Sequence, residues 1–267
     1  MLRFFVILAA VLTAAVVVSI VGYIAIKGIP YIKPSLFAWK YTSQNVSLMP
    51  SLVNTVLTLI LALVIATPLG IFAAVYLAEY AKRGNTFVKI IRMAAETLSG
   101  IPSIIYGLFG YLTFVLFWRG YSILAGGLTL AIMVLPVIMR TTEEALLAVP
   151  DMYREGSFGL GAGRLRTVLR VVLPPAIPGI LAGVILATGR IVGETAALVF
   201  TAGSTEKIPS SLFDSAATLA VHMYNISREG LHIGQAYATA LVLIALVVLI
   251  NMLSAWVAKK MTGEHNG

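Results

Sequence analysis

The chain has 267 residues, of which 59% are apolar and 11% charged, with a mean hydropathy of +0.95 and a formal net charge of +8. Soluble domains contain about 45–50% apolar and about 25% charged residues, so this composition excludes a soluble fold. The absence of cysteine excludes disulfides and cysteine-ligated metal sites, and the three scattered histidines lack the spacing of metal ligands. The basic residues lie between apolar runs, which is typical of membrane topology and not of nucleic-acid binding.

Six apolar runs are long enough to cross a bilayer, which takes about 20 helical residues. They lie at about residues 4–26, 51–78, 97–118, 120–139, 177–200 and 236–256. The first run is longer than the apolar core of a signal peptide, and no small-residue cleavage site follows it, so we interpret it as a signal anchor. We therefore expect an all-α membrane protein with six transmembrane helices in one domain, residues 1–267.

The distribution of lysine and arginine predicts the orientation of the spans. With the amino terminus inside, the inner segments contain 12 of these residues and the outer segments contain 6. Because inner loops carry the excess of positive charge, this bias predicts that both termini and the loop 140–176 are cytoplasmic. The loop 201–235 is then outside.

The inner loop 140–176 has the pattern of a helical hairpin. Asp151, after a proline, favours the start of a short helix. A tight turn is then permitted by Gly159, Gly161 and Gly163. A second short amphipathic helix should follow, ended by Pro174, Pro175 and Pro178, which also begin the next span. These residues fit both an interfacial hairpin on anionic lipid and an element that docks on a partner.

Two charged residues, Arg190 and Glu194, fall inside the fifth run. An arginine at the centre of a span costs about 2.5–3.5 kcal/mol on insertion scales, so it needs a partner or a polar cavity. Glu194, four residues later on the same helical face, is one such partner. The other interpretation is an anion site, because a guanidinium binds oxyanions through two parallel hydrogen bonds. Arg140 ends the fourth run, where a basic residue usually anchors the helix at the headgroups.

The segment from residue 155 to residue 174 resembles the coupling loop of ABC-importer permeases. In that pattern Glu-Ala-Ala is followed by three residues and Gly, and then by nine residues, Ile, one residue and Leu-Pro. The matching positions here are Glu155, Gly156, Ser157, Gly161, Val171, Leu173 and Pro174. The resemblance implies that this loop docks on a separate ATPase subunit. The chain has no GxxxxGK[ST] motif, so ATP binding and hydrolysis are expected on that partner.

Residues 50–258 resemble the phosphate-specific permeases of ABC importers, of the PstA type. The runs that carry the resemblance are ETLSGIPSIIYGLFGY, LPVIMRTTEEALLAVPDMYREGSFGLGAG, LATGRIVGETAALVFTAG and AYATALVLIALVVLINML. The resemblance implies a type I ABC-importer permease fold with a cytoplasmic coupling helix, and substrate-binding roles for Arg190, Glu194 and Arg140. It implies no catalytic residue, metal or cofactor.

The same resemblance implies a set of partners. They are a PstC-type permease subunit, a dimer of the ATPase subunit, an extracytoplasmic phosphate-binding protein and membrane lipid. The expected protein is a multi-pass subunit of a bacterial or archaeal cytoplasmic membrane that forms half of a phosphate path. Two alternatives are a permease for another oxyanion, such as molybdate or sulfate, and a non-transporting scaffold or signalling subunit. The Gly-Glu-Thr-Ala run at residues 193–196 argues against the first, and intact Arg190 and Glu194 argue against the second.

Overall fold

The computed structural model describes the backbone of residues 2–82 and 84–263, and the side chains of residues 3–82 and 84–256. All regular secondary structure in these residues is helical, which confirms the expected all-α class. The helices are α1 (Leu2–Gly28), α2 (Met49–Val75), α3 (Thr86–Ser99), α4 (Ser103–Gly110), α5 (Leu116–Trp118), α6 (Ile123–Leu147), α7 (Asp151–Gly159), α8 (Arg164–Thr167), α9 (Leu173–Val192), α10 (Ala196–Val199), α11 (Leu219–Glu229) and α12 (Ile233–Gly263). Single π-helical turns continue α2, α4 and α8 as η3 (Tyr76–Tyr80), η4 (Tyr111–Val115) and η5 (Val168–Val172).

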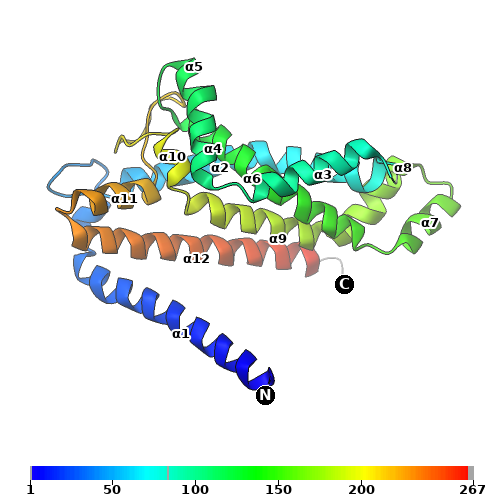
Figure 1. Ribbon diagram of the computed structural model, residues 1–267, viewed down its shortest axis with the longest axis horizontal. Coiled ribbons are helices and arrows are strands. Elements are labelled where there is room, and N and C mark those ends of the chain that lie inside the picture. The colour runs from blue at the N-terminus through cyan, green and yellow to red at the C-terminus, as the bar shows by residue number, and fades with distance from the viewer. Residues whose placement is uncertain (1, 83, 264–267) are drawn as a thin grey trace.

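Helix α6 forms the centre of the bundle. It packs against α2, α9, α3 and α4, and 67% of its most apolar stretch is buried. Helices α9 and α12 run side by side, whereas α1 packs on α12 near its own C-terminal end and then diverges from the bundle (Figure 1). The apolar side chains of α1 are consequently exposed within this chain, as suits a helix surrounded by lipid.

Five helical segments are long and apolar enough to cross a membrane, and a sixth crossing results if α3 and the segment Ser103–Trp118 count as one bent pair. This bend changes the expected span 97–118, because the two arms of the pair meet at 103°. The break falls at Gly100 to Pro102, where the proline disfavours a helical conformation for the residue before it. Thr97 therefore belongs to α3 and not to the second arm.

The expected ranges 120–139 and 177–200 also differ from the helices. Helix α6 continues to Leu147, because the charged residues after position 139 form ion pairs on its surface instead of ending it. Helix α9 ends earlier, at Val192, and Gly193 is its C-cap. The non-helical parts of the loop 140–176 are therefore short, at residues 148–150 and 160–163.

The prolines after residue 173 do not end the helix that begins at Arg164, contrary to the expectation. Residues 164–192 form one continuous helical segment. The reason is the π-turn η5, in which Leu173 N–H bonds to the carbonyl of Val168, five residues back. Such a turn widens the helix ahead of Pro174 and Pro175, so their rings and missing N–H groups are tolerated.

Candidate functional site

The contacts between α6 and α9 fix how far along the bundle Arg190 lies. Small residues set an antiparallel register, with Gly183 against Thr141 and Gly179 against Ala145. Continued along both helices, this register places Arg190 level with Val134, close to the middle of α6. At a rise of 1.5 Å per residue, Arg190 is about 9 Å along the axis from the level of Arg140. Arg190 is thus in the last turn of α9 and half-way along the bundle.

Two helical segments are interrupted near this level, and two further helices contain a proline there. The registers of α3 and α2 relative to α6 follow from other contacts. Ion pairs join α3 to α6, and Gly70 of α2 lies against Ile138 of α6. The interruptions are the bend at 100–102 and the break at 193–195. Pro68 and Pro136 lie near the same level inside α2 and α6, which continue past them as unbroken helices. Interrupted backbone at membrane depth is tolerated where it is buried in protein or lines a polar cavity. Broken helices of this kind surround the ion sites of many transporters.

Arg190 and Glu194 are close in sequence but do not form an ion pair in the described residues. Glu194 is buried, and its Oε1 accepts a hydrogen bond of 3.0 Å from Ala197 N–H in the turn of α10. The pairing fails because α9 ends at Val192, so positions 190 and 194 are no longer one turn apart on a single helix. Arg190 is half-buried in the last turn of α9.

Arg140 lies on the surface of α6 and is held by carboxylates. Its Nε bonds to Glu144 at 3.1 Å, and its Nη1 lies 3.8 Å from Glu96 of α3. A cavity of about 300 Å³ separates α3 from α6 here. The structure therefore does not bring Arg140 and Arg190 into one cluster, because Arg140 is further along α6 and already paired.

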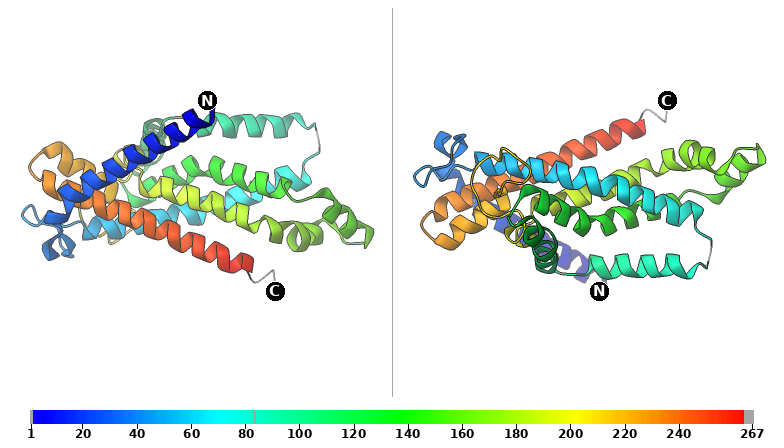
Figure 2. Two further views of the ribbon diagram at one scale, coloured as in Figure 1. Left: turned by 90° about the horizontal axis from the view of Figure 1, so that it is seen from below. Right: turned by 90° about the horizontal axis from the view of Figure 1, so that it is seen from above.

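The loop residues predicted to contact an ATPase lie around one end of the bundle. Helix α7 and the corner after it project beyond the other helices, at the end opposite α11 (Figures 1 and 2). Glu155 and Gly156 are exposed, while Ser157 Oγ is 2.8 Å from Thr167 Oγ1 of α8. The predicted corner is formed by Gly161, which has a φ of +81°. Further back, the half-buried pair Leu173 and Pro174 forms the first turn of α9.

The sequence reasoning missed one residue that positions this loop, Arg154. Its Nη2 bonds to Glu79 of η3 at 2.7 Å, and its Nη1 and Nη2 bond to the carbonyls of Val149 and Leu146 at 2.7 and 2.8 Å. The hydrogen bond that Arg154 donates to Glu79 raises the pKa of Arg154. The only sequence signal was a basic residue in the first turn of a helix, where the helix dipole disfavours it.

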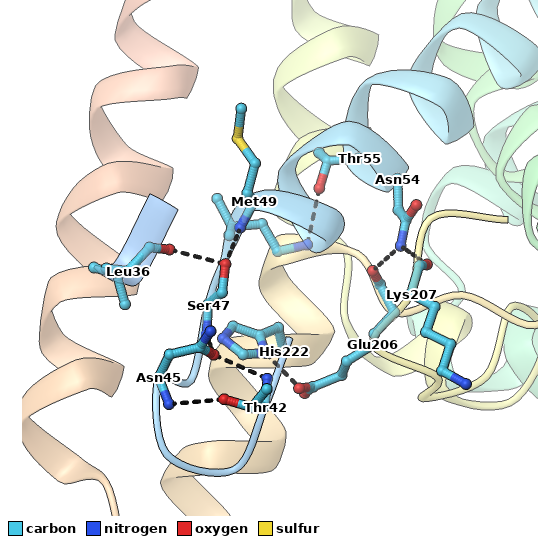
Figure 3. A network of polar contacts seen from close by, with 12 residues as sticks. Leu36, Thr42, Asn45, Ser47, Met49, Asn54, Thr55, Glu206, Lys207 and His222 are labelled. Carbon is cyan, nitrogen blue, oxygen red and sulfur yellow. Dashed lines mark hydrogen bonds and ion pairs between the residues drawn. The ribbon is translucent and has the colours of Figure 1, made fainter. Parts of the chain in front are cut away.

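At the α11 end of the bundle, segments that are distant in sequence meet in a polar network (Figure 3). His222 of α11 is fully buried, and its Nδ1 lies 2.7 Å from Glu206 Oε1. Asn54 of α2 donates two hydrogen bonds of 3.0 Å to the carbonyls of Lys207 and Ala217. No sequence motif marks these residues, because only the fold brings them together. They fix the 201–218 segment against α2 and α11.

Comparison with known proteins identifies the family. Residues 66–263 match the family described as binding-protein-dependent transport system inner membrane component. The chain is 38% identical to the probable ABC transporter permease protein YqgI of Bacillus subtilis, over 96% of this chain and 95% of that protein. It is 35% identical to the phosphate transport system permease protein PstA of Haemophilus influenzae, over 76% and 72% of the two chains.

The fold agrees with this assignment. A chain of a bacterial alginate ABC transporter, crystallised with its alginate-bound periplasmic protein, superposes with a TM-score of 0.68. It is 15% identical and covers 97% of this chain and 96% of its own. The expected permease fold is thereby confirmed. The chain belongs to the inner membrane components of binding-protein-dependent transport systems and is a permease subunit of an ABC importer.

Proposed function

We propose that this chain forms half of the path by which phosphate crosses the membrane, and that Arg190 binds the ion. The observation that carries the proposal is the position of Arg190. It is half-buried at the level where the helices are interrupted, and no carboxylate pairs with it in the described residues. A guanidinium in such a site offers two parallel hydrogen bonds to a tetrahedral oxyanion.

The choice of phosphate rests on the relatives. Several proteins named phosphate transport system permease protein PstA are 34–37% identical to this chain. Molybdate and sulfate have the same tetrahedral shape, so the geometry of Arg190 alone does not separate them. Adding molybdate or sulfate as a competitor in the phosphate-uptake measurement below distinguishes the three possible substrates.

ATP is required because of the charge that is moved. Phosphate carries between one and two negative charges near pH 7, and each charge costs about 2.3 kcal/mol against a potential of 100 mV. Import into a negative interior is therefore uphill before any concentration gradient is added. We assign the hydrolysis to an ATPase subunit dimer that docks on α7 and its flanking residues, from Glu155 to Gly161 and at Leu173 and Pro174. We call α7 and the corner after it, residues 151–163, the hook. Exposed apolar side chains on the hook support docking, among them Met152, Tyr153, Phe158 and Leu160.

The other expected partners complete the transporter. A PstC-type permease would supply the second half of the path, and a phosphate-binding protein would deliver the ion to the α11 end.

In this arrangement both termini and α7 are cytoplasmic. The chain has no native cysteine, so Gly156→Cys and Ser211→Cys, both at exposed positions, can be labelled in intact cells with an impermeant reagent. Only Ser211→Cys should react, and reaction of both from outside would refute the orientation.

The test of the ion site is phosphate uptake at matched membrane abundance. Arg190→Ala should abolish uptake, and Arg190→Lys should leave weak uptake, because a lysine keeps the charge but not the planar pair of donors. Co-purification of the ATPase subunit with each variant is the control for assembly. Normal uptake by Arg190→Ala would refute the anion site.

A further inference from the structure

A wide basic cleft lies beside α7, on the face where α2 ends and α3 begins. Its volume is about 1070 Å³. The end of η3, the start of α3, α7 and α8 form its walls. The apolar part of the lining consists of Leu77, Ala78, Ala81, Val88, Leu147 and Phe158. Phe87 and Ile90 of α3, beside the cleft, are exposed by 59% and 56%.

The charges in the cleft are unequal. The cations are Lys82, Lys89, Arg92, Arg154 and Arg164, and the carboxylates are Glu79 and Asp151. Both carboxylates bond to Arg154, and Arg92 bonds at 2.6 Å to Glu143 outside the cleft.

Three cations are therefore left without a carboxylate. Lys82 and Lys89 are exposed, and Arg164 lies 5.2 Å from the centre of the Tyr80 ring. Within the described residues no acidic side chain pairs with any of the three. The stacking on Tyr80 holds the guanidinium of Arg164 in place at the wall of the cleft. The cleft thus combines a positioned guanidinium with two exposed ammonium groups around one open space.

We propose that the basic cleft binds the phosphate group of an anionic ligand, either a phospholipid headgroup or inorganic phosphate. A planar guanidinium and two ammonium groups are the donors that recognise phosphate oxygens. The apolar wall and the exposed side chains of α3 suit an acyl chain beside such a headgroup. A bound phosphate would join α3 and η3 to the helix α8 that follows the hook. It would thereby steady α7 relative to the bundle. The proposal does not depend on which ion the transporter moves.

The test uses the full-length chain purified with its co-expressed transporter subunits. The variant Lys82→Gln/Lys89→Gln removes the two unpaired lysines, and Arg164→Gln removes the third cation from a different element. The matched control is Lys27→Gln/Lys33→Gln, which removes the same charge from exposed lysines at the other end of the bundle. One arm measures retained phosphatidylglycerol by native mass spectrometry. The other arm titrates delipidated protein with inorganic phosphate by calorimetry.

We expect the double variant to bind either phosphatidylglycerol or inorganic phosphate about 30-fold more weakly. Each basic side chain near an anionic surface contributes about 1 kcal/mol, which is about a fivefold change in affinity. A loss confined to the lipid arm identifies a headgroup, and a loss in the phosphate arm identifies the free ion. Arg164→Gln should weaken the same arm, and the control should change neither. Unchanged binding in both arms overturns the proposal. Unchanged binding together with loss of the ATPase subunit overturns it as well and assigns the cleft to ATPase docking.

Discussion

Arg154 of α7 and Glu79 of η3 form an ion pair of 2.7 Å whose side chains are only 13% and 7% exposed. The pair joins residues 75 positions apart and ties the hook to the end of α2. The two carbonyl bonds of Arg154 complete the coordination of its guanidinium. This nearly buried contact is therefore one of those that hold α7 in place, and its contribution can be measured.

Glu79→Ala should destabilise the docked position of α7 by about 1.5–3 kcal/mol, because it removes charge-assisted hydrogen bonds from a nearly buried guanidinium and leaves Arg154 only the exposed Asp151 as a carboxylate partner. Hydrogen exchange of the α7 amides, and co-purification of the ATPase subunit, measure the effect. Glu144→Ala is the control, since it breaks an exposed pair with Arg140 worth less than about 1 kcal/mol. Equal exchange rates in the two variants would contradict the role of the pair.

Gly161→Ala should weaken the corner after α7. The position has a φ of +81°, where a side chain costs about 1–2 kcal/mol. Added atoms would meet nothing within 4 Å, so the cost comes from the backbone alone. Gly159→Ala is the matched control: it also adds a methyl group in open space but lies in the last turn of α7. We expect reduced ATPase binding and uptake only for the change at 161, and similar losses for both would rule out the backbone explanation.

Glu194→Gln should retain most phosphate uptake, whereas Glu194→Ala should reduce it. The side chain accepts a hydrogen bond from Ala197 N–H, and an amide oxygen can replace the carboxylate there, whereas removing such an acceptor costs about 1 kcal/mol. Failure of the Gln variant would show that the negative charge itself is needed. The double change Arg190→Ala/Glu194→Ala should not restore uptake, because the two side chains form no pair that could be removed together. Rescue by the double change would support a structural pair instead.

Tyr41 should ionise with a pKa of about 12, because burial and the neighbouring Glu206 both raise the pKa of its hydroxyl above 10. Since the raised pKa favours the neutral form, its contribution to stability is complete below pH 10 and is lost as the pH rises through about 12. The difference in absorbance at alkaline pH between the parent and Tyr41→Phe isolates this titration. Glu206→Gln should shift it toward lower pH, and an unshifted titration would contradict the contact.

The sequence predicted the class of fold and indicated the candidate functional elements. Apolar runs of bilayer length identified the membrane helices, because lipid imposes a minimum length that composition reveals directly. The glycine at position 161 and the acidic start of α7 predicted the hook, since turn and cap preferences are local. Arg190 was identified as a candidate site residue because a charge inside an apolar run is rare and is visible in the sequence alone.

The tertiary structure decided where helices break and which charges meet. Pro102 explains why the chain breaks at 100–102. The 103° angle of that bend, the early end of α9 and the passage of a helix through Pro174 depend on packing and on one π-turn. The pairing of Glu79 with Arg154, and the separation of Arg190 from Glu194, follow from helices brought together across the chain. Membrane insertion depends on composition within one segment, whereas ion pairs depend on register between segments. Only the assembled bundle sets that register.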